Sequence, residues 1–239
     1  FIAGYIASFV IKFLEEKVPA GLDLIVIILV AAPLTYFIGD VTSPVVNGVL
    51  NTVGTVLIEA STASPIIMGI ILGGLITVVA TAPLSSMALT AMIGLTGAPM
   101  AIGALSVFGS SFMNFVFFSK MKFGSKKDNI AVAIEPLTQA DLISANPIPV
   151  YVTNFIGGAM SGVIIASMGL VNNSPGTATP IAGLAVMFAY NPAIKVLIAA
   201  AGCALVSIFG GFIGYAIFKN YKIVTADVVR GNDKEEVAA

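Results

Sequence analysis

Long apolar segments, interrupted by short stretches rich in proline, glycine and serine, dominate this chain. No Asp, Glu, Lys or Arg occurs from Ala60 to Ser119. Because a membrane-spanning helix needs about 20 residues, this run alone predicts two or more passes. The apolar blocks do not alternate with the period of two that is typical of a transmembrane β-barrel. We therefore expect an all-α polytopic integral membrane protein with broken helices and re-entrant hairpins.

Apolar segments of helical length follow one another along the chain, after an apolar helix expected at residues 1–14. The predicted spans are 22–38, with Pro33 as a kink, 65–82, 101–118, 150–170 and 193–218. Segment 41–58 carries a stripe of Asn and Thr side chains, and fits either a short span facing the protein interior or a helix at the membrane interface. Segments 83–99 and 172–192 are bounded by prolines, too short to cross and too polar for lipid, which predicts two re-entrant hairpins.

Lysines are concentrated in a few short segments between the predicted spans. Four of them lie in the loop at residues 120–127, next to a single acid, Asp128. Under the positive-inside rule this loop faces the cytoplasm, and the lysines at 12–17 and 219–222 mark the same side. This pattern predicts a multi-pass protein whose C-terminus is cytoplasmic.

Two parts of unequal length are expected. Residues 1–222 form the transmembrane domain, and residues 223–239 form a charged cytoplasmic tail that is expected to be disordered from Asp227. The chain begins without Met and inside an apolar helix. We therefore expect part of the N-terminus of the transmembrane domain to be missing from this sequence.

Composition supports the membrane assignment and narrows the chemistry. The chain is 58% hydrophobic and 10% charged, with a mean hydropathy of +1.03, whereas soluble domains carry about 25% charged residues. Histidine is absent, which removes the usual proton shuttle, phosphoryl acceptor and metal ligand. The only cysteine, Cys203, lies in an apolar segment and is expected to pack. We predict no cofactor, no metal site, no nucleic-acid binding and no catalysis within this chain.

The most informative segment is 134–149, which places carboxylates, amides and prolines between apolar spans. Glu135 precedes Pro136, which favours an extended or turn conformation at the carboxylate. At a helix break it could accept sugar hydroxyls, bind a cation or carry a proton, or else be an ordinary solvated loop acid. Gln139 and Asn146 suit recognition of a polyol or sugar, although caps and turns use the same residue types.

A second polar cluster follows the span at 150–170. Hydroxyls and backbone amides at the start of a half-helix make a ready site for an anionic or polyhydroxy ligand. Segment 176–179 fits this description, and Ser85 and Ser86 are its counterparts in the earlier hairpin. The predicted solute-binding residues are Glu135, Thr138, Gln139, Asn146, Gly176, Thr177, Thr179, Ser85 and Ser86.

Several short motifs resemble the membrane-embedded IIC component of bacterial sugar phosphotransferase systems. The opening Phe1-Ile-Ala-Gly-Tyr-Ile-Ala with Lys12 is similar to a fructose-type IIC helix. The segment from Ile134-Glu-Pro to Ala145-Asn-Pro is similar to that family's Ile-Thr-Glu-Gly-Ala-Ile-Pro-Phe…Ala-Asp-Pro segment. The Gly-Ala-Ile-Pro-Phe portion is absent here and the spacing is longer, so only Glu135 and Asn146-Pro147 carry over.

A divergent branch of IIC-like proteins, which includes one named as a regulator of the toxin perfringolysin O, is more similar. Its short Gly/Thr/Ser-Leu-Gln segment, followed by Asn and Pro, resembles Leu137-Thr-Gln139 and Asn146-Pro147. A later Gly-Thr-Ser-Gly-like loop resembles Pro175-Gly-Thr-Ala-Thr179. The resemblance covers most of the chain.

The resemblance implies a bacterial inner-membrane homodimer that binds a small polar solute between a scaffold and a moving hairpin domain. It also implies separate IIA and IIB proteins if phosphoryl transfer occurs, because this chain has no histidine of IIA type and no plausible cysteine of IIB type. Three functions stay open at this point: a carrier of a sugar or similar solute working by alternating access, a membrane sensor or regulator, and a proton- or ion-coupled carrier of an organic anion in which Glu135 takes up the proton.

Overall fold

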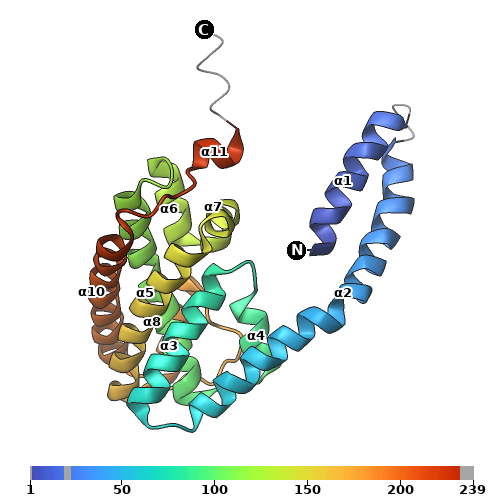
Figure 1. Ribbon diagram of the computed structural model, residues 1–239. Helices are drawn as coiled ribbons and strands as arrows, with labels where there is room; N and C mark the ends of the chain where they lie inside the picture. Colours follow the sequence, from blue (N-terminus) through green and yellow to red (C-terminus); the bar gives the residue numbers. More distant parts are fainter. Residues whose placement is uncertain (1, 19–22, 232–239) are drawn as a thin grey trace. The chain divides into compact units, whose positions relative to one another are not determined.

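The computed structural model describes residues 2–18 and 23–231, and the described part is helical apart from loops and one isolated β-bridge. The chain divides into two compact units, residues 1–53 and 54–239. The helices, drawn in Figure 1, are α1 Ile2–Lys17, α2 Asp23–Ser61, α3 Pro65–Thr81, α4 Ser86–Met92, α5 Gly97–Met121, α6 Lys126–Ile134, the 3-10 helix η1 Pro136–Gln139, α7 Ala140–Ala145, α8 Pro147–Met168, α9 Pro180–Tyr190, α10 Ala193–Phe218 and α11 Ala226–Arg230.

Helix α2 differs from the sequence prediction, which treated 22–38 and 41–58 as separate segments. It is one helix of 39 residues that runs through Pro33 and Pro44. At 1.5 Å per residue this is about 58 Å, roughly twice the hydrocarbon thickness. Hydroxyls within it bond to the preceding turn, as Thr42 Oγ1 does to the Ile38 carbonyl at 2.7 Å. Such local bonds satisfy polar side chains inside a helix, so polarity in this stretch did not mark a break.

Four helices of the described part are long and apolar enough to cross a membrane: α2 (over Val26–Ser61), α5, α8 and α10. Helices α3 and α9 are apolar but shorter, at 17 and 11 residues. The spans predicted at 101–118, 150–170 and 193–218 are therefore confirmed as α5, α8 and α10, whereas the span predicted at 65–82 is the shorter apolar helix α3, and a complete crossing by it stays a prediction.

Helices α3 and α8 pack backbone to backbone through glycines. A Cβ placed on Gly69 would lie 2.6 Å from the Gly162 carbonyl oxygen, and one on Gly158 would overlap Thr77 Oγ1 and the Gly73 carbonyl oxygen. Small residues permit this close approach, which is a common device for association of helices in membranes. Of the small residues expected to do this along 150–170, Gly158 and Gly162 have α3 as their partner, whereas Gly157 packs against α5 and α10.

Helix α3 forms the first arm of a hairpin, and α4 forms the second. After a break at residues 82–85, α4 runs back beside α3 (Figure 1). It ends near the end of α2, where the Ile93 side chain lies against Gly54. The first re-entrant hairpin thus spans about residues 65–96, not 83–99 as the sequence predicted. Prolines mark its tip, but only the packing of α3 shows that the entering arm is helical.

A second hairpin, at residues 172–191, enters as an irregular segment and returns as α9. Its start pairs with the base of the first hairpin, because Gly97 and Asn172 exchange two backbone hydrogen bonds of 2.8 and 3.0 Å. Its end returns to the same place, since the Asn191 side chain bonds to both the N–H and the carbonyl of Val171. The predicted hairpin at 172–192 is confirmed.

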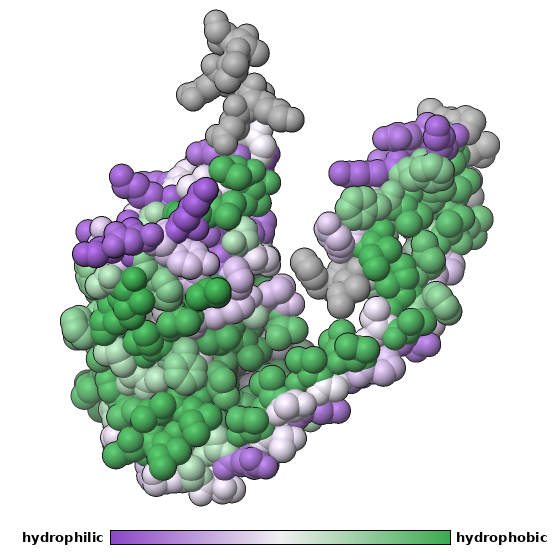
Figure 2. All heavy atoms as spheres, in the orientation of Figure 1, coloured by the Kyte–Doolittle hydropathy of each residue, from purple (hydrophilic) through white to green (hydrophobic). Residues whose placement is uncertain are grey.

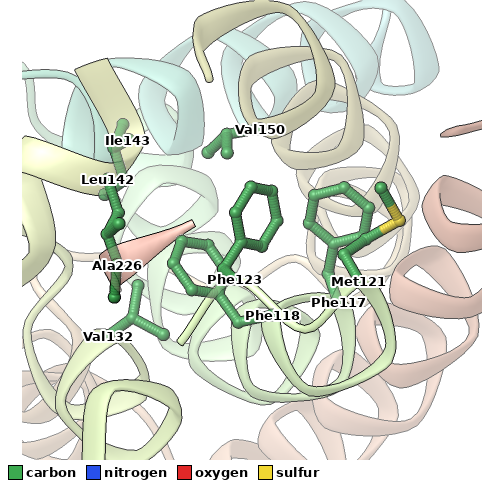
Figure 3. Packing of buried hydrophobic residues seen from close by; sticks show 9 residues of the cluster. All are labelled: Phe117, Phe118, Met121, Phe123, Val132, Leu142, Ile143, Val150 and Ala226. Carbon is green, nitrogen blue, oxygen red and sulfur yellow. The ribbon is translucent and has the colours of Figure 1, made fainter. Parts of the chain in front are cut away.

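A hydrophobic cluster closes one end of the 54–239 unit. Figure 3 shows the rings of Phe117, Phe118 and Phe123 side by side, with the centroids of Phe118 and Phe123 4.5 Å apart. Ala226 joins this cluster from the C-terminal segment, and its N–H donates to the Phe123 carbonyl at 2.7 Å. The segment through Gly231 is therefore packed and not disordered as expected, while 232–239 lie outside the described residues.

The surface of the 54–239 unit matches a membrane-embedded helical body. On the face shown in Figure 2, hydrophilic residues gather at the end that carries α6, α7 and α11, and the surface along α10 is largely apolar. Exposed apolar side chains on α10 include Leu205 and Phe209. Because no aqueous fold exposes such a continuous apolar surface, lipid is the natural solvent for these helices.

Candidate solute site at the hairpin tips

Glu135 stands at a true helix break. Helix α6 ends at Ile134, Glu135 has φ −149° and ψ 106°, and Pro136 begins the short helix η1. Its backbone N–H still donates to the Ala131 carbonyl at 2.9 Å. Its carboxylate accepts only a long contact of 3.5 Å, from the Leu137 N–H. The restriction before proline thus produces the predicted turn and leaves the carboxylate available.

The tips of the two hairpins meet at the same level of the protein. Ser86 Oγ, which is buried, donates to the Ala178 carbonyl at 2.8 Å. Ser85 caps α4, because its hydroxyl accepts the Ala88 N–H at 3.1 Å. Thr179 stands directly before α9, with no hydrogen bond from its side chain to that helix. The hydrogen bond from Ser86 to Ala178 therefore links the two hairpin tips directly, although these residues lie 92 positions apart in the sequence.

A cavity of about 80 Å³ lies between these tips and the break at Glu135. Its walls are formed by the end of α3, the start of α4, the segment after α6 and the start of α9. The residues that line it are Ala80, Leu84, Ser85, Ser86, Met87, Glu135, Leu137, Ala178, Thr179 and Pro180. Four predicted site residues, Ser85, Ser86, Glu135 and Thr179, therefore come together from three separate segments, and Glu135 is the only charged one among the lining residues.

The start of α9 adds a second polar feature to this cavity. Pro180 occupies the first helical position and has no N–H, and the free N–H groups of the first turn follow it. A helix N-terminus carries a partial positive charge. The cavity thus has hydroxyl groups from Ser85 and Thr179 and the acceptor carboxylate of Glu135 along its wall, beside the start of α9, which suits a neutral solute bearing several hydroxyl groups.

Gly176 and Thr177 shape the second tip. Thr177 Oγ1 accepts from Asn172 Nδ2 at 2.9 Å and donates to the Ser174 carbonyl at 2.8 Å. Gly176 has a φ of +77°, and a Cβ there would lie 3.3 Å from the Met87 carbonyl oxygen of α4. These predicted site residues do not line the cavity. They hold the loop that presents Thr179.

The structure places the other three predicted residues away from the cavity. Thr138 is exposed, and its hydroxyl donates to the Glu135 carbonyl at 2.7 Å. Gln139 is buried and accepts from Arg230 at 2.7 Å. Asn146 is buried and bonds twice to the main chain of Val224, at 2.8 Å each. Gln139 and Asn146 anchor the C-terminal segment next to the broken helix.

Comparison with known families agrees with this architecture. A family model described as the phosphotransferase system EIIC matches residues 1–230. The chain belongs to the phosphotransferase-system EIIC family. No curated protein and no solved structure matches it. The family supports a membrane component of sugar phosphotransferase transport, and the site geometry of this EIIC protein has to be argued from its own residues.

Arg230 organises the end of this EIIC protein, and the sequence analysis missed it. Its guanidinium binds Asp128 at 2.7 Å, Asp141 at 2.8 Å and Gln139 at 2.7 Å. Burial alone would raise the pKa of Asp128, but hydrogen bonds from Arg230 and Ser125 lower it below its usual value. The pKa of Asp141 is likewise lowered, burial being outweighed chiefly by Arg230. Arg230 is the only arginine of the chain, and this is the sequence feature that could have pointed to it.

Two asparagines inside the helical bundle were also missed. Asn154 on α8 donates to Asn114 Oδ1 on α5 at 2.9 Å, and both residues are fully buried. Thr77 on α3 donates to the Asn154 backbone carbonyl at 2.9 Å. The side-chain Nδ2 of Asn114 and the side-chain Oδ1 of Asn154 are buried without a hydrogen-bond partner. These side-chain and backbone amides join three helices, α3, α5 and α8.

Proposed function

We propose that this protein is the solute-translocating membrane subunit of a phosphotransferase-type system, and that it moves a sugar or a similar small polar solute by alternating access. The observation that carries the proposal is the cavity between the two hairpin tips and Glu135. Discontinuous helices that meet inside a membrane protein are the usual construction of a transport site. Membership of the EIIC family supports the same assignment.

The size of the cavity supports a moving site. At about 80 Å³ it is well below the roughly 300–1,000 Å³ of ordinary small-molecule sites. A hexose therefore enters only after the tips separate. The bond between Ser86 and Ala178 is the direct link that has to break or shift. We propose that the structure represents a closed state and that hairpin movement opens it.

The order of the helices supports one membrane orientation. Two long helices, α2 and α5, lie between the lysines at 12–17 and the loop at 120–127, and another two, α8 and α10, lie between that loop and the lysines at 219–222. With the hairpins returning to the side they entered from, each pair of crossings brings the lysines back to the same face. We propose that this face is cytoplasmic, that the membrane is the bacterial inner membrane, and that the C-terminus lies inside.

The proposed partners follow from the chemistry that the chain lacks. Histidine is absent and the single cysteine, Cys203, is buried within α10. We propose that separate IIA and IIB proteins phosphorylate the solute where phosphorylation occurs, and that the protein is a homodimer. Chemical cross-linking in native membranes tests the dimer.

A ligand screen tests the solute site. The purified full chain is heated with a panel of sugars, polyols, sugar acids and vitamins, because a ligand that binds the folded state raises the melting temperature. Loss of a charge-assisted hydrogen bond costs about 1.5–3 kcal/mol. We therefore expect Glu135→Gln to weaken the hit by about 10- to 100-fold, and Ser86→Ala to weaken it less.

Glu59→Gln is the matched control, since Glu59 is an exposed carboxylate at the end of α2. A ligand that raises the melting temperature of Glu135→Gln as much as that of the wild type contradicts the proposed site. No hit for well-folded protein favours the regulator function. Uptake in proteoliposomes whose pH dependence disappears in Glu135→Gln favours the proton-coupled anion carrier instead.

A further inference from the structure

A second and larger cavity, of about 420 Å³, opens on the outer surface of the 54–239 unit. Helix α5 forms its floor, α10 and the end of α6 form its sides, and the start of α9 closes it. Its lining residues are Phe108, Ser111, Phe112, Phe115, Val116, Ala133, Ile134, Pro180, Ile181 and Ile208. Only Ser111 carries a polar side chain. We call this cavity the α5 crevice.

The α5 crevice is open to the surroundings of the protein. Phe112 and Phe115 are 39% and 41% exposed, and Ile134 and Ile181 on the opposite wall are more exposed still. Both α5 and α10 are long and apolar enough to cross a membrane. In a membrane, an apolar crevice between two such helices faces the acyl chains of the lipids, and these chains fill it.

One end of the α5 crevice leads to a positively charged side chain, that of Lys120. Phe108, Phe112, Val116 and Lys120 follow one another at intervals of four residues and therefore share one face of α5. The Lys120 ammonium lies over the Phe212 ring, 5.6 Å from its centroid. Phe212 stands one turn after Ile208 on α10, so both walls of the crevice lead to this ammonium.

We propose that the α5 crevice binds one phospholipid with an anionic headgroup, its acyl chain along Phe108, Phe112 and Val116 and its phosphate at Lys120. Phe108 and Lys120 are twelve positions apart, which is about 18 Å of helix. One leaflet contributes about half of the 30 Å hydrocarbon thickness, so the crevice has the depth of a single chain. Lysines at the membrane surface attract anionic headgroups.

The crevice shares a wall with the cavity at the hairpin tips. Pro180 lines both, Ile134 of the crevice precedes Glu135 of the cavity, and Ile181 follows Pro180. A bound chain therefore packs behind the start of α9 and the end of α6. The lipid site itself stands on the crevice and Lys120, and does not depend on whether the neighbouring cavity carries a solute.

Native mass spectrometry of the detergent-purified full chain tests the site. The protein is incubated with phosphatidylglycerol or with phosphatidylcholine that has the same acyl chains. We expect one tightly retained phosphatidylglycerol per chain, with at least tenfold preference over phosphatidylcholine. Lys120→Gln should remove that preference, and Ala133→Phe, which fills the crevice, should remove retention of both lipids. Inorganic phosphate alone should not compete, because it lacks the chain.

Two controls keep the outcome decisive. Lys127→Gln removes an exposed lysine at the start of α6, and Leu205→Phe enlarges an exposed apolar residue of α10 outside the crevice. Both should retain the lipid. Equal retention by Lys120→Gln and the wild type overturns the proposal, whether or not Ala133→Phe folds. A photoreactive residue at position 115 that cross-links to a second copy instead of to lipid also overturns it.

Discussion

Asn146 is almost fully buried, and both ends of its side-chain amide bind the main chain of Val224. The same amide also donates to the Leu142 carbonyl at 2.9 Å. An asparagine before proline at the start of α8 therefore joins the broken helix to the C-terminal segment. Glu135, eleven residues earlier, makes no comparable contact. Neighbouring polar residues of similar type thus have different roles.

Replacing Asn146 by alanine should lower stability. The change leaves the Val224 N–H and carbonyl without their partners, and each unsatisfied buried group costs about 1–3 kcal/mol. We expect a lower melting temperature in detergent for Asn146→Ala, and little change for Asn173→Ala, whose side chain is exposed. A variant that keeps its melting temperature but loses solute binding would place Asn146 in the solute site instead.

The ion pairs of Arg230 should respond to pH in one direction only. The pKa of Asp128 and of Asp141 lies below the usual 3.8, so their stabilising effect is complete above that value and is lost as the pH falls through the lowered values. We expect Arg230→Gln to increase hydrogen exchange of residues 223–231 equally from pH 8 to about 4.5. Below the usual pKa the difference from the wild type should shrink.

Lys222→Gln serves as the control for the loss of a positive charge near this segment. Because Arg230 is one-third exposed, we expect a contribution of about 1 kcal/mol, the upper part of the range for surface pairs. A difference between Arg230→Gln and the wild type that grows steadily between pH 8 and 5 would contradict the assignment to these carboxylates.

At the scale of elements, the contact between α3 and α8 supports the first hairpin. Glycines 69, 73, 158 and 162 bring the two backbones together, and the tip at 82–86 projects from this rigid base. Residue composition predicted close packing along α8, but it could not identify α3 as the partner. Helix α3 therefore looked like an independent span in the sequence, although its 17 residues end at the cavity.

Enlarging Gly158 should disrupt this pair of helices. A valine there overlaps Thr77 and the Gly73 carbonyl, and neither is the movable end of a long side chain. Overpacking of this kind costs about 1–3 kcal/mol or more. We expect Gly158→Val to aggregate or to melt at a clearly lower temperature by size-exclusion and thermal-shift measurements. Gly202→Ala is the control, because its Cβ would lie at an ordinary 3.6 Å from Ile164.

At the scale of the whole molecule, four helices of the described part are long and apolar enough to cross a membrane, two before and two after the lysines at 120–127. The count of four crossings before residue 120 required 41–58 to be a separate span, and it is instead part of the single helix α2, while 65–82 is the shorter apolar helix α3. Two helices that can cross, α2 and α5, stand where four crossings were considered, so the number before residue 120 remains even. The cytoplasmic side predicted for the lysines therefore stays a prediction, and it requires fewer crossings than the sequence suggested.

Cysteine labelling in intact cells tests that orientation. We expect a membrane-impermeant maleimide to label Asn173→Cys directly and Lys127→Cys only after permeabilisation, since α8 separates the two positions. The native Cys203 is buried and gives little background. Labelling of both positions from the same side would refute the proposed topology.

The sequence by itself determined the membrane environment, the helical class, the long helices α5, α8 and α10, and the break at Glu135. These follow from local physics, namely hydrocarbon length, backbone satisfaction and the restriction before proline. The tertiary structure decided which polar residues meet. Ser85, Ser86, Glu135 and Thr179 line one cavity, whereas Gln139 and Asn146 bind the C-terminal segment. Contacts between residues some 40 to 90 positions apart depend on how helices pack, and that information is not carried by any local pattern.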